Sequence, residues 1–107
     1  MARKQLKTLT EPMYYILLCL LQPMHGYGIM QRIDAMTEGR VKVGPGTLYA
    51  LISRFEKEEI VIKVSSDNGK KTYVLTEKGK EILINEYNRL NQLVSDGEVL
   101  GGESDES

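Results

Sequence analysis

The chain has 107 residues, of which 41% are hydrophobic and 27% are charged, a composition typical of one globular domain. Its longest apolar run, residues 13–21, has nine residues, about half of the ~18 that a membrane-spanning helix needs. No cleavage-type signal pattern follows the basic N-terminus, and the single cysteine, Cys19, lies in the apolar run, where a buried core residue is expected. These features predict a cytoplasmic protein without a membrane segment.

The net charge of −1 conceals a separation of charge along the chain. All 14 basic residues lie in residues 1–94 together with ten of the 15 acidic residues, so this part carries a net charge of +4. Residues 96–107 contain five acidic residues and no basic residue, with several glycines and serines. We expect them to form a disordered acidic tail. Residues 1–9 form a basic N-terminal arm that contains Arg3, Lys4 and Lys7.

Two helices are predicted in the first 39 residues. Thr10 can cap the first helix, which has Pro12 in its first turn, and its buried stripe is expected to comprise Ile16, Leu17, Leu20 and Leu21. Pro23 and Gly26 break the chain. Helical spacing resumes with Ile29, Met30 and Ile33, and Gly39 is the expected stop.

A third helix is predicted after a short β-type segment at residues 40–43. Pro45 is suited to the first helical position and Gly44 to the cap before it. Leu48, Leu51, Ile52 and Phe55 recur at helical spacing, which makes theirs the inward face. The outward face then comprises Gly46, Thr47, Tyr49, Ala50, Ser53 and Arg54.

A β-hairpin is predicted around Asn68-Gly69, because these residue types accept the positive φ angles of a type I′ turn. With that turn, Val64 would pair with Tyr73 and Ile62 with Leu75 on one apolar face of the hairpin. Lys70 and Lys71 would lie at its tip.

A long helix is predicted over residues 77–95, capped by Thr76. Its heptad-like stripe comprises Leu83, Tyr87, Leu90 and Val94. The order of elements predicts an α+β fold, a winged helix-turn-helix domain at residues 10–76 followed by a C-terminal helix.

The third helix and the hairpin have the residues of a DNA-binding surface. Small, hydroxyl-bearing side chains on the helix would allow it to enter a major groove. The hairpin lysines would lie beside a phosphate backbone. Taken alone, the helix face is equally compatible with a solvated surface, and two lysines at a turn more often serve only solubility.

No pattern in the sequence indicates an enzyme. His25 is the only histidine and has no second metal ligand at a suitable spacing, so no metal site is expected. Cys19 has no evident base partner, and no phosphate-binding loop is present. We therefore expect neither catalytic residues nor a cofactor.

Four motifs in this order resemble the PadR family of transcriptional regulators. They are Tyr-x-Ile-Leu in the first helix, His-Gly-Tyr-x-Ile at the second, Gly-Thr-Leu-Tyr-x-Leu-Ile-x-Arg in the third, and Tyr-x-Leu-Thr-x-x-Gly after the hairpin. Together they cover roughly residues 13–94. The short C-terminal region is similar to the subfamily that has one long helix after the winged domain.

The resemblance implies a homodimeric regulator of transcription, usually a repressor, that binds a palindromic operator in double-stranded DNA. Its DNA contacts would come from Gly46, Thr47, Tyr49, Ala50, Ser53, Arg54, Lys70 and Lys71. The long helix would be the dimerisation helix, and the dimer interface would comprise Tyr14, Tyr15, Leu83, Tyr87, Leu90 and Val94. Some members of the family bind flat aromatic effectors between these helices, so a small aromatic effector is a further expected partner.

A second hypothesis is a winged helix that binds another protein and not DNA. The modest charge of +4 on residues 1–94 leaves this alternative open. The two hypotheses differ in whether the hairpin lysines affect binding to DNA.

Overall fold

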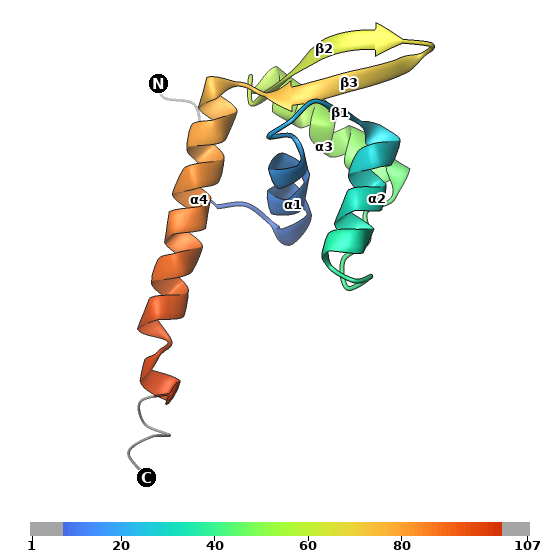
Figure 1. Cartoon of the computed structure of the whole chain (residues 1–107). Helices are drawn as coiled ribbons and strands as arrows, with labels where there is room; N and C mark the ends of the chain where they lie inside the picture. Colours follow the sequence, from blue (N-terminus) through green and yellow to red (C-terminus); the bar gives the residue numbers. More distant parts are fainter. Residues whose placement is uncertain (1–7, 102–107) are drawn as a thin grey trace.

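The computed structural model describes residues 8–101 and has the winged helix-turn-helix fold that the sequence predicts (Figure 1). Three helices pack together beneath a small antiparallel sheet, and a fourth helix runs along one side. In chain order the elements are α1 (Glu11–Cys19), β1 (Met24–His25), α2 (Gly26–Met36), α3 (Pro45–Lys57), β2 (Val61–Asp67), β3 (Lys70–Leu75) and α4 (Glu77–Asp96).

The helix starts follow from local chemistry. The Thr10 hydroxyl accepts a hydrogen bond from the Met13 amide at 3.3 Å, and the Thr76 hydroxyl accepts one from the Gly79 amide at 3.0 Å. Both caps are confirmed, as is the start of α3 at Pro45 after Gly44. The cap of α2 was not anticipated: His25 Nδ1 accepts a hydrogen bond from the Gly28 amide at 3.1 Å.

The core lies between α1, α2, α3 and the inner face of the sheet. Its largest fully buried side chains are Phe55, Ile16, Leu17, Leu20, Ile29, Ile33, Leu48, Ile52, Ile60 and Val61. Cys19 is buried, as expected. The prediction for Leu21 was wrong: because α1 ends at Cys19, the side chain of Leu21 turns outward and is 50% exposed.

The sheet has the strand order β1-β3-β2, in which β1 pairs with β3 through Met24↔Tyr73 and His25↔Thr72. The β-type segment expected at residues 40–43 is not a strand. Its apolar residues Val41 and Val43 are buried instead as side chains of a loop. A short apolar segment can thus contribute to a core without pairing, which periodicity alone does not distinguish.

The hairpin turn is confirmed, but the pairing beyond it differs from the prediction. Asn68 and Gly69 have φ angles of 53° and 77°, as a type I′ turn requires. A bulge at Val64 then shifts the register, so that Lys63 pairs with Tyr73 and Ile62 with Val74. The predicted pairs Val64–Tyr73 and Ile62–Leu75 are therefore wrong, and Ile62 and Val64 are exposed.

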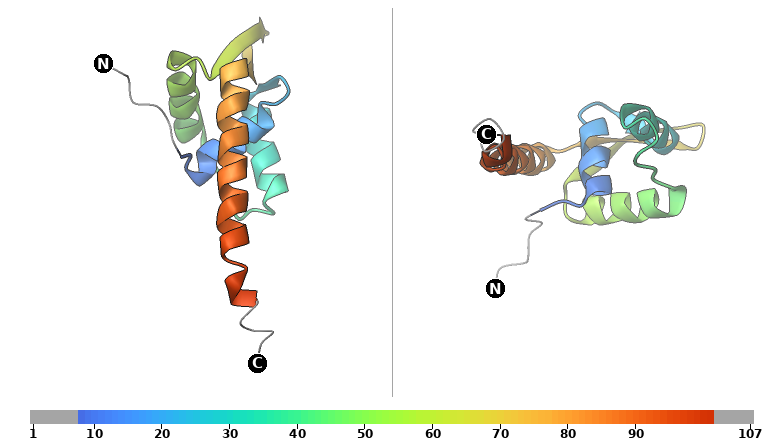
Figure 2. Two further views of the ribbon diagram at one scale, coloured as in Figure 1. Left: turned by 90° about the vertical axis from the view of Figure 1, so that its left-hand side faces the viewer. Right: turned by 90° about the horizontal axis from the view of Figure 1, so that it is seen from below.

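The fourth helix, α4, begins against the domain and continues past it. Gly79 lies so close to the Ile60 carbonyl that a Cβ atom would collide with it. The left view in Figure 2 shows the second half of α4 extending beyond α1, α2 and α3. The helix ends at Asp96, one residue later than expected, and residues 97–101 form a turn and a short helical stretch. The rest of the expected acidic tail, residues 102–107, and most of the basic arm, residues 1–7, lie outside the described residues.

Candidate nucleic-acid interface

Helix α3 presents the face that the sequence predicts. Leu48, Ile52 and Phe55 are buried, and Leu51 is half-buried, which holds the opposite side of the helix outward. Gly46, Thr47, Tyr49, Ala50, Ser53 and Arg54 are all exposed. No acidic residue occurs from residue 46 to residue 55. The first two and a half turns of α3 therefore form a slim, uncharged-to-basic surface.

The glycine at position 46 is not required by the packing of the described chain. A Cβ atom placed on Gly46 would meet no described atom within 4 Å, and the same is true of Gly44. Glycine in a helix costs up to about 1 kcal/mol relative to alanine. The described fold therefore does not require a glycine at position 46. Its lack of a side chain would instead allow another molecule to approach the helix closely.

Tyr49 leans from α3 onto the start of α2. Its hydroxyl and ring lie where a Cβ atom of residue 26 would stand, so glycine at that position makes room for the tyrosine. Tyr49 is nevertheless 48% exposed. This contact explains why glycine occurs in the His-Gly-Tyr motif, and it directs the tyrosine hydroxyl toward the hairpin.

A hollow of about 330 Å³ lies where the hairpin, the start of α2 and α3 meet. It is lined by His25, Gly26, Tyr27, Tyr49, Gly69, Lys70, Lys71 and Tyr73. The structure thus brings together three predicted DNA-binding residues, Tyr49, Lys70 and Lys71, from two elements. Sequence reasoning missed His25 and Tyr27 as neighbours of this hollow, because only strand β1, which it did not predict, places them beside the hairpin.

The polar groups around the hollow are mainly hydrogen-bond donors. Burial raises the pKa of Tyr73 above its ordinary value, and the nearby Glu56 and Tyr49 act in the same direction, so its hydroxyl keeps its proton at neutral pH. Because His25 Nδ1 accepts the capping hydrogen bond, the neutral ring carries its proton on Nε2. Together with the two lysines, these groups favour an anionic ligand.

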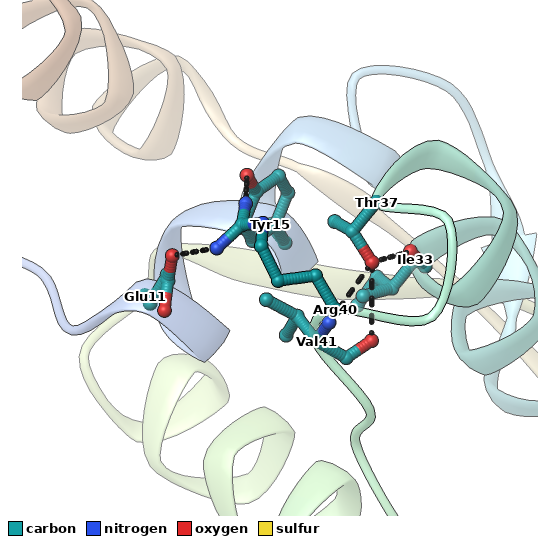
Figure 3. A network of polar contacts seen from close by, with 6 residues as sticks. All are labelled: Glu11, Tyr15, Ile33, Thr37, Arg40 and Val41. Atoms are coloured by element: carbon teal, nitrogen blue, oxygen red, sulfur yellow. Dashed lines mark hydrogen bonds and ion pairs between the residues drawn. The ribbon is translucent and has the colours of Figure 1, made fainter.

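The segment between α2 and α3 is held by polar contacts on both sides (Figure 3). The Thr37 hydroxyl donates to the Ile33 carbonyl at 2.8 Å and accepts from the Val41 amide at 3.1 Å. Arg40 donates to Glu11 at 2.7 Å and to the Tyr15 hydroxyl at 2.8 Å. The hydrogen bond to Glu11, followed by the contributions of Tyr15, raises the pKa of Arg40. Tyr15, expected in a dimer interface, therefore has a partner within its own chain.

A second exposed surface is apolar and lies on α4. Leu83 is only 4% exposed and belongs to the chain's own core, so it is removed from the expected dimer surface. Tyr87 and Val94 are 54% and 67% exposed, and Leu90 is half-buried. Leu93, which the sequence places with Ile82 in a second partial apolar stripe, is also exposed on this helix, as is Ile84, which lies in neither stripe.

Between α4 and the start of α1 lies a smaller hollow of about 280 Å³. Tyr14 and Tyr15 line it and meet edge to face, with ring centroids 6.0 Å apart. Glu86 is 3% exposed. Its carboxylate accepts two hydrogen bonds from the Arg89 guanidinium group, at 2.9 and 2.8 Å, and one from the Leu9 amide at 3.3 Å. The contact with Arg89 lowers the pKa of Glu86 despite its burial.

The model of the PadR-like family of transcriptional regulators matches residues 16–85, well over half of the chain. The chain belongs to the PadR-like family. The PadR-like fold accounts for the helix order, the sheet and the final helix.

Individual relatives agree with this assignment. The PadR-like transcription factor of Bacteroides fragilis has 32% sequence identity and a TM-score of 0.59, with 78% of this chain and 85% of that chain covered. The PadR-like regulator of Bacillus cereus has 21% identity and a TM-score of 0.69, with 81% and 87% covered, which shows likeness of fold.

Among curated proteins, the transcriptional regulator YqjI of Escherichia coli is 31% identical over 59 residues, which are 55% of this chain and 28% of YqjI. An uncharacterised 37.1 kDa transposon protein of Streptomyces fradiae is 30% identical over 86 residues, 78% of this chain and 24% of that protein. This PadR-like chain thus spans about a quarter of the length of the curated relatives it matches.

Two properties of the described residues bear on other functions. None of the helices in this part of the chain is long and apolar enough to cross a membrane. Among the same residues, no group of three or more His, Cys, Asp and Glu is placed to hold a metal ion.

Proposed function

We propose that this PadR-like protein binds double-stranded DNA as a homodimer and represses transcription from a palindromic operator. The observation that carries the proposal is that Tyr49, on the exposed face of α3, meets the hairpin lysines around one hollow. A major groove about 12 Å wide admits a helix. The hairpin would then lie along the flanking backbone, where each neutralised phosphate adds salt-dependent affinity.

The side chains on α3 suit distinct parts of the DNA. Gly46 and Ala50 would let the helix lie close to the base edges, and Thr47, Ser53 and Arg54 would form hydrogen bonds there or with phosphates. Tyr49, Lys70 and Lys71 border the hollow of about 330 Å³, which suits a backbone phosphate. Tyr27 and His25 join this set as donors from α2 and β1.

Homodimerisation is supported by the outer half of α4. Gly79 and Leu83 pack on the domain. Leu90 and Val94 follow at helical spacing and therefore lie on the same side of α4. Leu90 is half-buried and Val94 is 67% exposed, and Figure 2 shows the second half of α4 extending beyond the other helices. A continuous apolar stripe without cover favours a partner helix, and a second copy of this chain presents the same stripe. The expected interface comprises Tyr14, Tyr87, Leu90 and Val94, with Leu93 added.

Symmetry then sets the form of the operator. In a two-fold dimer the two copies of α3 would enter successive major grooves about 34 Å apart, so the half-sites would form a palindrome. A bound dimer of this kind would compete with other proteins for the promoter, which is the basis for proposing repression.

The hollow between α1 and α4 suits a small aromatic effector. Tyr14 and Tyr15 offer ring surfaces, and Leu9 and Leu90 offer apolar walls. Because this hollow lies beside the proposed dimer surface, a bound effector would alter the angle between two copies.

The test is selection of DNA from a random pool by the full-length protein, followed by affinity measurements on the selected site. We expect a palindromic site, and we expect Thr47→Ala to weaken it by about 5- to 100-fold, the value of one or two base contacts. Val64→Ala, an exposed change on the outer strand of the hairpin, is the control. Enrichment of no sequence would contradict the proposal.

A second candidate function is binding of another protein through the winged domain, favoured by the exposed apolar side chains of Ile62 and Val64 on β2. Reversal of Lys70 and Lys71 to Glu distinguishes the two. It should abolish DNA binding under the first proposal and leave any residual DNA affinity unchanged under the second.

A further inference from the structure

We propose that Arg40 is a positioning residue that sets the start of α3 by tying the preceding segment to α1 through Glu11 and Tyr15. This inference rests on the proposed DNA-binding function of α3. Arg40 lies in the segment 37–44, which ends at Gly44, directly before the face that would enter the groove. The contact therefore joins α1 to the segment that leads into the helix proposed to contact DNA.

The segment 37–44 has only a few side-chain ties, and Figure 3 shows those at its centre. Thr37 holds it to the end of α2 through the Ile33 carbonyl and the Val41 amide. Lys42 returns to α2 as well, with its Nζ atom 2.8 Å from Asp34. Among the described residues, Arg40 is the one side chain of this segment that hydrogen-bonds to α1.

The start of α3 depends on this segment because its own cap is weak. Gly44 makes no side-chain hydrogen bond to the first turn of the helix, unlike Thr10, His25 and Thr76 at the other three helices. Pro45 presets one φ angle but donates no hydrogen bond. The direction in which α3 leaves the segment is therefore set by the buried Val41 and Val43 and by Arg40.

The geometry at Arg40 suits orientation more than stabilisation. One guanidinium group contacts two α1 side chains that lie one helical turn apart, at 2.7 and 2.8 Å. Two bonds from one planar group fix its direction as well as its distance. The ion pair is exposed, with 59% and 57% of the Arg40 and Glu11 side chains accessible, so its contribution to folding is expected to be small.

A substitution of Glu11 distinguishes this positioning role from a direct contact between Arg40 and DNA. Replacing an acidic residue near a DNA-binding surface should strengthen binding when charge alone matters. Under the positioning role, Glu11→Gln weakens specific binding instead, because Arg40 loses its anchor. We expect Glu11→Gln, Tyr15→Phe and Arg40→Gln each to lower affinity for the selected operator by about three- to tenfold. The double variant E11Q/R40Q should be no weaker than R40Q.

Non-specific binding supplies the second readout. Measured on a DNA duplex of unrelated sequence, the affinity of E11Q should equal or exceed that of the wild type, and the salt dependence of R40Q should match the wild type. Glu38→Gln is the matched control. Like Glu11→Gln it removes one negative charge, but Glu38 is not the ion-pair partner of Arg40. A direct phosphate contact by Arg40 would instead lower the salt slope by about 0.9 and leave R40K close to the wild type. Either result would overturn the positioning role.

Hydrogen exchange without DNA tests the same inference independently of the proposed function. In E11Q and R40Q the hydrogen-bonded amides of Arg40, Val41 and Leu48 should exchange severalfold faster than in the wild type, while those of β3 should not change. Unchanged exchange in this segment together with unchanged operator affinity would contradict the inference. Absence of any DNA binding by the wild-type protein would instead contradict the proposed function and leave the exchange result to decide the positioning role.

Discussion

The exposed part of α3 and the outer half of α4 are both left uncovered by the folded domain, but their chemistry differs. The exposed face of α3 has glycine, alanine, hydroxyl groups and an arginine, and the lysines of the hairpin lie beside it. The outer half of α4 exposes Tyr87, Leu93 and Val94. The polar surface on α3 is stable in water without a partner and can bind a charged, hydrated ligand. The apolar surface on α4 favours permanent cover by protein.

The difference also concerns what holds each surface in place. Three buried side chains and the contacts of the 37–44 segment set the direction of α3. Helix α4 contacts the domain through its first half, around Gly79, Leu83 and Glu86, and its outer half has no comparable support. We therefore expect substitutions at the two surfaces to affect different equilibria, DNA binding in one case and assembly in the other.

The largest effect is expected on α4. The double substitution Tyr87→Glu and Val94→Glu places two charges in the apolar stripe, which should raise the dimer dissociation constant more than about 100-fold. Analytical ultracentrifugation over a range of concentrations measures this change. Asn85→Glu with Asn88→Glu, on the opposite side of the same helix, is the matched control. A wild-type protein that is monomeric at high concentration would contradict the role given to this surface.

The next largest effect is expected at the hairpin. Lys70→Gln with Lys71→Gln removes two phosphate contacts, which should lower operator affinity roughly 10- to 60-fold near 0.1 M salt and lower the salt slope by about 1.8. Fluorescence anisotropy at several salt concentrations provides both values. Lys80→Gln, on α4, serves as the control and should leave the slope unchanged. A slope that is equal in all three proteins would show that the hairpin does not contact the backbone.

A smaller effect is expected from Gly26→Ala. The added Cβ atom would occupy the place of the Tyr49 ring, which can swing toward solvent because it is half exposed. Operator affinity should fall by about three- to tenfold, the effect of one misplaced contact, while the free energy of unfolding changes by less than about 1 kcal/mol.

Gly79→Ala is the contrasting variant for the same measurement. Its Cβ atom would meet the Ile60 backbone, which cannot move aside, so stability should fall by about 1–3 kcal/mol. Chemical denaturation measures the free energy of unfolding of G26A and G79A. An equal loss in the two variants would mean that the Tyr49 ring cannot swing toward solvent, which would contradict the prediction for G26A.

The smallest effect concerns Glu86, which pairs with Arg89 on the same helix and ties α4 to Leu9. Its pKa is lowered in the folded protein, so its ionised form stabilises the fold above the unfolded-state value of about 4.3. This contribution is lost as the pH falls through the folded value. Glu86→Gln should therefore cost about 1–2 kcal/mol at pH 7 and much less near pH 3. A difference between the two proteins that grows toward acid pH would contradict this sign.

Most of the elements could be predicted because their signals are local. Caps at Thr10 and Thr76, Pro45 at the start of α3, and Asn68-Gly69 in the turn act through neighbouring residues. The errors arose where the outcome depends on distant residues. The bulge at Val64 shifts the register after a correctly predicted turn, and β1 forms only because Tyr73 and Thr72 supply its pairing partners.

The candidate site shows the same division. Helical spacing alone identified the outward face of α3, because a buried face fixes its opposite. It could not show that Tyr49 rests on Gly26, that Leu83 belongs to the core, or that Tyr15 bonds with Arg40. Tyr49 and Gly26 are 23 positions apart in the sequence, and Tyr15 and Arg40 are 25 apart. The burial of Leu83 depends on where α4 crosses its neighbours. No short-range sequence pattern indicates such contacts.

The sequence by itself determined the order of the helices, the type of the turn and the family, since these depend on motifs and on periodicity within one segment. Only the tertiary structure decided which exposed residues meet. It brought His25 and Tyr27 to the hairpin lysines and Arg40 to α1, because packing around one core sets the distance between segments that the chain itself keeps far apart.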